Sequence, residues 1–225
     1  MARRLKRRQA REPMSRERVI GAAVAFADAN GIEALSMRRL AQDLGVEAMT
    51  LYYYVANKDA ILAGMIDRVV DEMVLPDAGS EWKAELRAAA VSAHDVLVRH
   101  PWAANLLLAG PGVSLPRLRW MDAILGCLRA AGFSADHTDH AYHALDSHIM
   151  GFSLWLVGIS TGLDRPGSVE DFLANLDIGS MPHLAEHVEQ HIAKRDAQPS
   201  EFEFGLDLIL DGLERQLATS RAGAA

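Results

Sequence analysis

The 225-residue chain is poor in cysteine, in aromatic residues and in long apolar runs. Cys127 is its single cysteine, so it can form neither an internal disulfide nor a cysteine-based zinc site, and a reducing cytoplasm is the expected location. Only 6% of the residues are aromatic, β-branched runs are scarce, and Ala and Leu are abundant, which favours an all-α chain. No apolar run approaches the ~20 residues that span a bilayer, so no membrane segment is expected.

Sequence signals of catalysis are also missing. The chain has no glycine-rich phosphate loop and no nucleophile elbow, and adjacent polar residues such as Asp146, Ser147 and His148 would diverge on a helix. We therefore expect no enzymatic activity. Six of the nine histidines have helical spacing, but we find no cysteine or carboxylate partner for them, so no metal site or cofactor is expected. A hydrogen bond from one of them to a bound molecule is the alternative: His137, His140, His143, His183, His187 and His191.

Positive charge is concentrated at one end of the chain. Residues 1–60 contain 11 Lys/Arg and 7 Asp/Glu, a net charge of +4, whereas residues 61–225 have a net charge of −11. This asymmetry predicts that the N-terminal end meets a polyanion such as DNA. Residues 1–14 are expected to form a flexible basic arm that attracts phosphates, although a solvated tail without a role is the alternative.

The segment from Ser36 to Lys58 has the pattern of two short helices joined by a tight turn. Its first part has the apolar spacing of one helical face and begins with Ser36, a good N-cap. Gly45 can take the left-handed conformation that ends a helix, and a second short helix is expected over residues 47–55. This arrangement predicts a helix-turn-helix, whose second helix enters the DNA major groove.

The second of these helices is unusually rich in tyrosine. Tyr52, Tyr53 and Tyr54 are consecutive, and they cannot all point inward on a helix that turns 100° per residue. Together with Thr50 and Lys58 they offer hydroxyl and ammonium groups that reach phosphates and base edges. A tyrosine-rich helix that packs on a partner protein is the alternative.

The remaining chain predicts helices separated by short breaks. Residues 15–65 are expected to form a three-helix DNA-binding domain that contains the helix-turn-helix. Residues 66–220 are expected to form a helical domain for ligand binding and dimerisation, followed by a disordered tail at 221–225. The expected helices cover residues 15–30, 58–74, 81–99, 103–109, 115–131, 136–162, 182–194 and 200–220, with a variable connection and one short helix within 163–181.

Apolar rows on the long helix and on the last helix predict a homodimer. Ile149 and Phe152 belong to the first row and Leu208 to the second, and Gly205 and Gly212, seven residues apart, would permit close helix approach. Two ordinary core helices of a monomer are the alternative. Because dimers of this motif read two half-sites, the DNA partner is expected to be a palindromic operator.

With these residues in place, the chain resembles the tetracycline-repressor (TetR) family. The resemblance rests on GIEALSMRRLAQDLGVEAMTLYYYVANKDAIL at 31–62 and on FGLDLILDGLERQL at 204–217, together with Trp82 and the Ala-Gly-Phe at 131–133. The later segments resemble the subfamily that has a tetracycline-repressor-like C-terminal domain. The resemblance implies an all-α homodimeric repressor that a small molecule, bound in the C-terminal domain, releases from its operator.

The resemblance also implies roles for single residues of the helix-turn-helix. Arg38 would contact DNA from the first helix, while Thr50, Tyr52, Tyr53 and Tyr54 would line the DNA face of the second and Lys58 would hold a phosphate. Ala48 and Met49 stand at positions that read bases in the tetracycline repressor, but they are not the residues found there. Ala48 offers only apolar contact, so the operator is expected to differ.

The implied effector pocket departs further from the family pattern. Leu107 stands where the tetracycline repressor has a histidine that holds magnesium, and the resemblance places Ala89, Ala93, Met121 and Ile124 at other pocket positions. An uncharged lining of this kind predicts a mostly hydrophobic effector and no magnesium requirement. Three other functions remain open: a helical small-molecule carrier or an enzyme, each with a vestigial DNA-binding head, and an activator or ligand-independent DNA-binding protein.

Overall fold

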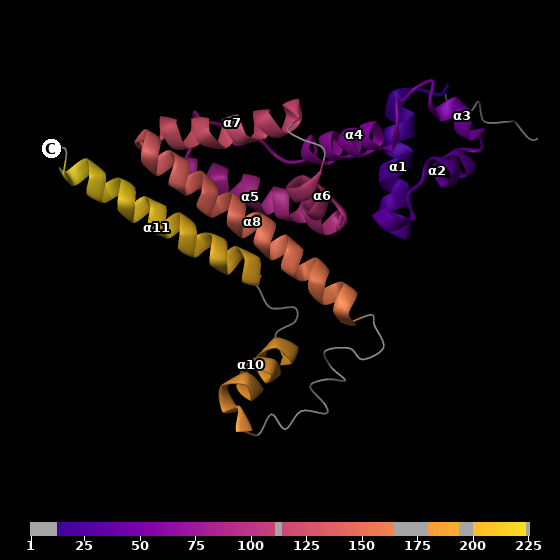
Figure 1. Cartoon of the computed structure of the whole chain (residues 1–225). Helices are drawn as coiled ribbons and strands as arrows, with labels where there is room; N and C mark the ends of the chain where they lie inside the picture. Colours follow the sequence, from indigo (N-terminus) through magenta and orange to yellow (C-terminus); the bar gives the residue numbers. More distant parts are fainter. Residues whose placement is uncertain (1–12, 111–113, 164–179, 194–199, 224–225) are drawn as a thin grey trace, which may run out of the picture. The chain divides into compact units, whose positions relative to one another are not determined.

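The computed structural model describes residues 13–110, 114–163, 180–193 and 200–223, and every element in these ranges is a helix (Figure 1). The all-α class expected from composition is therefore confirmed. The chain divides into two compact units, Met1–Met65 and Ile66–Ala225. Within the described ranges, no helix combines the length and the apolarity needed to cross a membrane. Residues 1–12 of the expected arm and residues 164–179 of the expected connection lie outside the described residues.

The first unit contains the predicted helix-turn-helix. It begins with α1 (Arg16–Asn30) and the 3-10 helix η1 (Ile32–Ala34), followed by α2 (Met37–Leu44) and α3 (Ala48–Leu51). α4 (Lys58–Val70) begins in this unit and ends in the second. The starts of α1, α2 and α4 are fixed by side-chain oxygens that accept a hydrogen bond from a free backbone N–H of the first turn. These oxygens belong to Ser15, Ser36 and Asn57, at 3.2, 3.3 and 2.8 Å from the donor nitrogen.

Apolar side chains from α1, α2, α3 and α4, together with Leu35 and Val55 from the connecting segments, form one small core. Removing their surface from water is the main favourable contribution to folding of the unit, and it holds the short α3 in place. The members of this core are at most 8% exposed: Val19, Ile20, Ala23, Val24, Ala27, Leu35, Leu40, Ala41, Leu44, Leu51, Val55, Ile61 and Met65.

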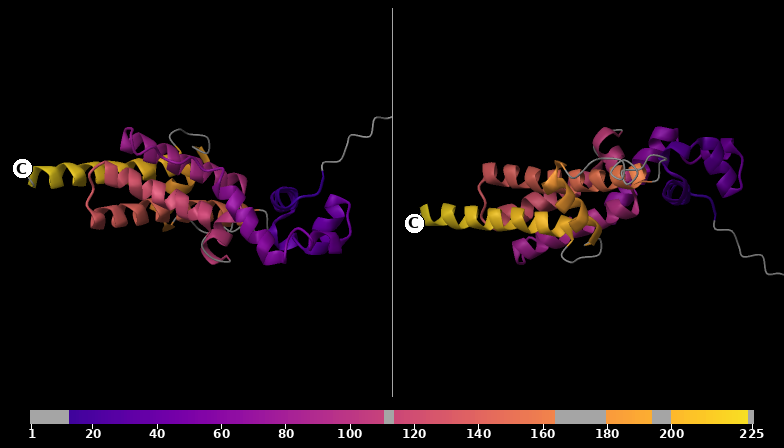
Figure 2. Two further views of the ribbon diagram at one scale, coloured as in Figure 1. Left: turned by 90° about the horizontal axis from the view of Figure 1, so that it is seen from above. Right: turned by 90° about the horizontal axis from the view of Figure 1, so that it is seen from below.

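The second unit is a helical bundle with α8 at its centre. α8 packs against α5, α6, α7 and α11, and Figure 2 shows α11 running beside it from two further directions. The largest fully buried side chains of the bundle include Phe202, Leu206 and Leu210, which form one stripe of α11. The helices of this unit are α5 (Trp82–Arg99), α6 (Ala103–Ala109), α7 (Leu115–Ala130), α8 (Ala135–Leu163), α10 (Pro182–Ala193) and α11 (Glu201–Gly223).

Apart from α3, which is described below, and from differences of one residue, two helix ends differ from their sequence predictions. α4 ends at Val70 rather than at residue 74, and residues 71–73 form turns. α11 continues to Gly223, so residues 221–223, which were expected in a disordered tail, are helical. A contact between residues far apart in the sequence accounts for the longer α11. Arg221 Nη2 donates a hydrogen bond to the Ala131 carbonyl oxygen at 2.7 Å.

Candidate functional site

The turn between α2 and α3 is set by a left-handed glycine. Gly45 has φ 67° and ψ 40°, a conformation that a side chain disfavours. Its N–H donates to the Gln42 carbonyl oxygen at 3.1 Å, and the Val46 N–H donates to the Ala41 carbonyl oxygen at 3.0 Å. These two bonds satisfy the last carbonyl groups of α2 and turn the chain into α3. The predicted helix-turn-helix is therefore present.

α3 is shorter than the helix predicted over residues 47–55. After Leu51 the chain forms a hydrogen-bonded turn, in which the N–H groups of Tyr54 and Val55 both donate to the Leu51 carbonyl oxygen at 2.9 and 3.0 Å. Leu51 and Val55 are 0% and 4% exposed, so they anchor the segment in the core. Their burial decides which neighbouring side chains stay at the surface.

The tyrosine segment presents a polar, exposed face to solvent. Tyr53 is 86% exposed, Met49 76% and Tyr52 47%. Tyr54 is half-buried, and its ring meets the Tyr53 ring edge-on, with the ring centroids 5.2 Å apart. This contact restricts the Tyr53 ring before any partner binds, which lowers the conformational entropy that binding would remove.

The other predicted DNA contacts differ in exposure. Arg38 and Lys58 are exposed, whereas Ala48 and Thr50 are half-buried. Arg39, which sequence analysis did not single out, is exposed next to Arg38 on α2, and its Nη1 donates to a backbone carbonyl oxygen at 3.4 Å. This surface therefore offers guanidinium, ammonium and hydroxyl groups, which are the donors that bind phosphate oxygens.

The second unit contains a cavity of about 40 Å³ that is lined by residues of α5, α6, α7 and α8 and of the C-terminal end of α4. Ala93 on α5 and Leu107 on α6, two of the predicted pocket residues, line it. The other three do not: Ala89 and Ile124 are buried elsewhere in the bundle, and Met121 lines a separate open hollow on α7. Further apolar wall residues are Val70, Met73, Ile149 and Met150.

The cavity wall is not uniformly apolar, which corrects the expectation of an uncharged lining. Arg117 and Trp120 from α7 and Tyr142 and Asp146 from α8 also line it. Sequence periodicity did not reveal them, because it does not tell which face of one helix another helix covers. Tyr142 and Asp146 are four residues apart and therefore lie on the same face of α8. That spacing was the one available signal.

Burial changes the acid–base behaviour of these two groups. Burial raises the pKa of the Asp146 carboxyl above its ordinary value, and the charges of Arg117 and His143 act in the opposite direction. Burial also raises the pKa of the Tyr142 hydroxyl; the charge of Asp146 adds to this rise and that of Arg117 opposes it. Arg117 itself donates from Nη1 to the Leu107 carbonyl oxygen at 2.8 Å, which ties α7 to α6.

α8 and α11 carry exposed apolar side chains next to their buried stripes. Phe204 and Leu208 are 61% and 57% exposed on α11, and Trp155 is 45% exposed on α8. Phe204 and Leu208 are four residues apart, so they lie on one face of α11. Exposed large apolar groups that are grouped in this way are typical of a protein–protein contact.

The other residues predicted at a dimer interface have different surroundings. Ile149 is 2% exposed within the single chain and lines the cavity, so it has almost no surface to offer a second copy. Phe152 is half-buried and packs on the Phe202 ring, with the centroids 5.6 Å apart. Gly205 and Gly212 are half-exposed on α11. Gly205 also lies against His148 of the same protomer.

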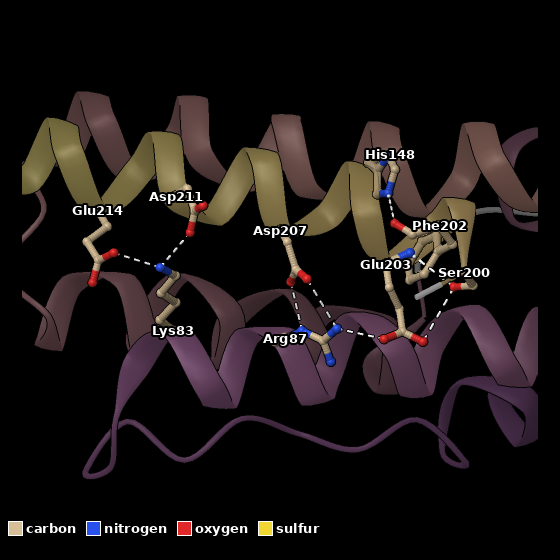
Figure 3. Close-up of polar contacts among 9 residues, drawn as sticks. All are labelled: Lys83, Arg87, His148, Ser200, Phe202, Glu203, Asp207, Asp211 and Glu214. Carbon is tan, nitrogen blue, oxygen red and sulfur yellow. Dashed lines mark hydrogen bonds and ion pairs between the residues drawn. The ribbon is translucent and has the colours of Figure 1, made fainter. Parts of the chain in front are cut away.

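A ladder of ion pairs joins α5 to α11 (Figure 3). Lys83 Nζ lies 2.7 Å from Asp211 Oδ1 and 2.6 Å from Glu214 Oε2. One turn further along α5, Arg87 contacts Asp207 at 2.7 Å and Glu203 at 2.6 Å. Partly exposed pairs of this kind contribute little to stability, but their spacing fixes the register of α11 on α5. The acidic face of α11 is therefore occupied within the chain, and its exposed apolar face remains available.

The histidines do not gather into a metal site within the described residues, where no group of three potential ligands occurs. The side chain of His191 lies outside the described residues. His94 and His148 instead both stack on the ring of Phe202, with their ring centroids 4.0 and 4.8 Å from that of Phe202. These two histidines are therefore part of the α5–α8–α11 core.

Comparison with known proteins agrees with this geometry. A family model described as "Bacterial regulatory proteins, tetR family" matches residues 19–65, and one described as "Tetracyclin repressor-like, C-terminal domain" matches residues 75–217. The HTH-type transcriptional repressor DrrR1 of Streptomyces coeruleorubidus is 32% identical over 97% of this chain and 85% of its own length.

Solved structures are similar over most of both chains. The structure of ActR from Streptomyces coelicolor in complex with actinorhodin has a TM-score of 0.69 and 25% identity, and covers 90% of this chain and 96% of that one. BioQ in complex with its double-stranded DNA operator has a TM-score of 0.61 and 25% identity, with coverages of 89% and 98%. On the family models, the relative and the helix-turn-helix geometry, the chain belongs to the TetR family of DNA-binding transcriptional repressors.

Proposed function

We propose that this protein is a cytoplasmic homodimer that represses transcription from a palindromic operator and is released by a small molecule bound in the α4–α8 cavity. The operator would contact α3, the exposed tyrosine segment that follows it, and the flanking Arg38 and Lys58. ActR bound to actinorhodin and BioQ bound to its operator are precedents for the two partners in proteins of this fold.

The observation that carries this proposal is the course of α4. The helix begins with Lys58, next to the tyrosine segment, and its last residue, Val70, lies in the cavity wall. Met73, just beyond the end of the helix, lines the same cavity. A molecule that displaces Val70 or Met73 therefore acts on the helix whose other end carries a proposed phosphate contact. Such a shared helix can couple the two sites by small rigid shifts.

The size of the cavity gives a reason for displacement. At about 40 Å³ it holds roughly one water molecule, whereas sites for drug-sized ligands occupy about 300–1,000 Å³. An effector must therefore separate the walls of the cavity. Met73 and Met150 are flexible enough to adapt. α6 is short, with seven residues, and is linked to α7 by the Arg117 hydrogen bond. We expect the DNA-competent state to be the one with the small cavity.

The exposed apolar face of α11 supports the homodimer. Among the described residues, Phe204 and Leu208 stay 61% and 57% exposed, and Trp155 of α8 stays 45% exposed. A second copy that packs the same face would bury all three by a two-fold contact. Gly212 has open space around its Cα, since a Cβ there would meet only Arg215 Nη2 at 3.9 Å. A partner helix could therefore approach closely.

The effector is expected to be mostly hydrophobic and to bind without magnesium. Leu107 contributes only aliphatic surface to the wall and has no atom that coordinates a metal. A carrier or enzyme with a vestigial head is the second candidate. It is less well supported, because a head without function has no need of an exposed tyrosine face beside exposed Arg38 and Lys58.

DNA binding and release can be tested together. Fluorescence anisotropy with labelled DNA from upstream of the gene should show tight binding that weakens as salt rises, because phosphate contacts release counterions. Actinorhodin is a suitable first candidate effector in this assay. Binding no stronger than that of scrambled DNA of equal length would refute the repressor. If the protein binds the DNA tightly, no candidate effector releases it, and transcription rises when the protein is present, an activator would be favoured.

A further inference from the structure

Trp120, a residue of the cavity wall, has an indole N–H without a hydrogen-bond partner among the described residues. Trp120 is 8% exposed and lines the cavity, and its Nε1 is buried with no acceptor within reach. A buried N–H that has lost water without gaining an acceptor destabilises the free protein. A ligand that brings an acceptor to this nitrogen recovers that loss, so Trp120 favours ligands with a carbonyl-type oxygen.

A second polar group faces the same space without a partner of its own. Asp146 lines the cavity, and no hydrogen bond or ion pair joins its carboxyl to another residue of the described part of the chain. Tyr142 lies one turn away on the same face of α8. A carboxyl group beside a phenolic hydroxyl accepts a hydrogen bond from a hydroxyl in either protonation state. This part of the wall therefore favours ligands with a hydroxyl donor.

The third polar side chain is already engaged. Arg117 donates to the Leu107 carbonyl oxygen at 2.8 Å and lies near enough to Asp146 to oppose the effect of burial on its pKa. Arg117 and Asp146 bring opposite charges to the wall, which together leave no net charge to compensate that of an ionic ligand in a largely apolar cavity. The balance of these two side chains favours an uncharged molecule.

The rest of the wall determines the body of the ligand. Val70, Met73, Leu97, Ile149 and Met150 offer apolar surface, and Trp120 adds an aromatic side chain, a residue type that packs well against rings. Apolar walls with a few placed polar groups are typical of small-molecule sites, where the polar groups fix orientation and specificity.

We propose that the effector is an uncharged, mostly apolar ring compound that presents a carbonyl-type oxygen to Trp120 Nε1 and a hydroxyl to the Asp146–Tyr142 pair. This inference rests on the proposed function and adds the chemical class of the effector. A site built to hydrogen-bond a polar group rejects analogues that lack it, because its own buried groups then stay unpaired. Trp120 Nε1 and the Asp146–Tyr142 pair should thus bind hydroxylated ring ketones more tightly than plain hydrocarbons of equal shape.

Calorimetric titration with three related probes tests the inference on the full-length protein. The probes are tetralin, its ketone alpha-tetralone, and a phenolic alpha-tetralone whose hydroxyl lies away from the carbonyl. We expect affinity to rise about fivefold to tenfold at each step, as one hydrogen bond is added. Trp120→Phe should remove the advantage of the ketone over tetralin, and Asp146→Ala should remove that of the added hydroxyl. Trp82→Phe, the same change outside the cavity wall, should keep both.

Each comparison is a ratio of the affinities of one variant for two probes. A general loss of stability lowers both affinities alike and therefore leaves the ratio unchanged. Equal affinity of the wild-type protein for the three probes, an unchanged ratio in Trp120→Phe, or no binding of any probe would overturn the inference. Release of operator DNA is measured separately. If an effector releases the DNA but the probes do not bind in the expected order, the inference is refuted and the proposed function stands. If the probes bind in the expected order but no effector releases the DNA, only the proposed function is refuted.

Discussion

Gly205 of α11 lies directly against the imidazole of His148 on α8, and a Cβ at this glycine would come within 2.6 Å of His148 Cε1. The imidazole is not free to move away. Its Nε2 lies 2.9 Å from the Phe202 carbonyl oxygen, and its ring stacks on the Phe202 ring at 4.8 Å (Figure 3). Gly205 therefore has a role inside one protomer, whereas sequence analysis gave it a role only between protomers.

We predict that Gly205→Ala lowers the free energy of unfolding by about 1–3 kcal/mol, because the added methyl group forces the His148 ring out of its stacked position. Gly126→Ala on α7 is the matched control, since a Cβ there meets nothing within 4 Å. The control should be neutral or stabilising by up to ~1 kcal/mol, the gain in helix propensity. Urea denaturation at equal protomer concentration measures both, and equal midpoints would contradict the proposed contact.

If the proposed homodimer packs on this face, Leu208→Glu should convert it to a monomer, because the substitution places a charge in the centre of the exposed apolar face of α11. Leu118→Glu on α7 is the control: Leu118 is 49% exposed, close to the 57% of Leu208, but lies away from the proposed interface. Light scattering after size-exclusion chromatography gives the mass. A dimer that survives Leu208→Glu, or that is lost equally in both variants, would refute this face as the interface.

Tyr53→Phe should weaken operator binding about fivefold, the effect of one hydrogen bond of ~1 kcal/mol, without changing stability, since Tyr53 is 86% exposed. Lys58→Ala should weaken binding and lower the slope of log affinity against log salt by about 1, the loss of one phosphate contact. Arg68→Ala, which removes an exposed cation from the last turn of the same helix, should leave the slope unchanged. Anisotropy over a salt series measures all three. If neither Tyr53→Phe nor Lys58→Ala changed the affinity for the operator, the proposal that DNA binds at α3 and the tyrosine segment would be refuted.

Acid should destabilise the bundle through His94. Burial lowers the pKa of His94 below its ordinary value of 6.5; His148 acts in the same direction, and Asp95 and Glu203 oppose it. The unfolded chain therefore binds a proton at His94 more readily than the folded protein does. This contribution to stability is fully present above pH 6.5 and is lost as the pH falls from 6.5 towards the lowered folded value.

Replacing His94 should consequently flatten the dependence of stability on pH. We expect His94→Gln to unfold at a nearly constant temperature across this acidic window, while the wild-type protein unfolds at progressively lower temperatures. His137→Gln, which changes a histidine near the start of α8 outside the Phe202 cluster, should keep the wild-type slope. Differential scanning calorimetry at a series of pH values gives the comparison, and a parallel decline in wild type and His94→Gln would count against His94.

Tetracycline with magnesium should neither bind tightly nor release the operator. Leu107 supplies no metal ligand to the cavity, and a hydrated metal chelate would have to enter a mostly apolar space. Removal of divalent ions with EDTA should accordingly leave release by the natural effector unchanged. Calorimetry and anisotropy with and without EDTA measure these effects. Micromolar binding of the chelate, or a requirement for magnesium, would show that other residues hold the ion.

Much of the local structure of the proposed DNA-binding surface was predictable, because residues close in sequence determine it. Ser36 and Gly45 start and end α2 through bonds to their immediate neighbours, and three consecutive tyrosines cannot all be buried on one helix. The length of α3 was not predictable in the same way. Leu51 and Val55 enter the core formed with α1 and α2, and this packing favours a tight turn after Leu51.

The cavity shows the limit of sequence reasoning. Ala93 and Leu107 were assigned through resemblance and do line it, but Trp120 and Asp146 were missed. An isolated tryptophan or aspartate on a helix gives no sign of the space it faces. That property depends on how α7 crosses α8, and this in turn depends on packing between residues far apart in the chain.

The sequence by itself determined the helical class, the helix-turn-helix and the concentration of positive charge at one end, because composition, capping and charge act over a few residues. The tertiary structure alone decided that Ile149 faces the cavity rather than a second copy, that Gly205 makes room for His148, and that polar groups interrupt an apolar wall. The physical reason is that a helix has several faces. Their roles are assigned only when neighbouring helices cover some of them and leave others exposed.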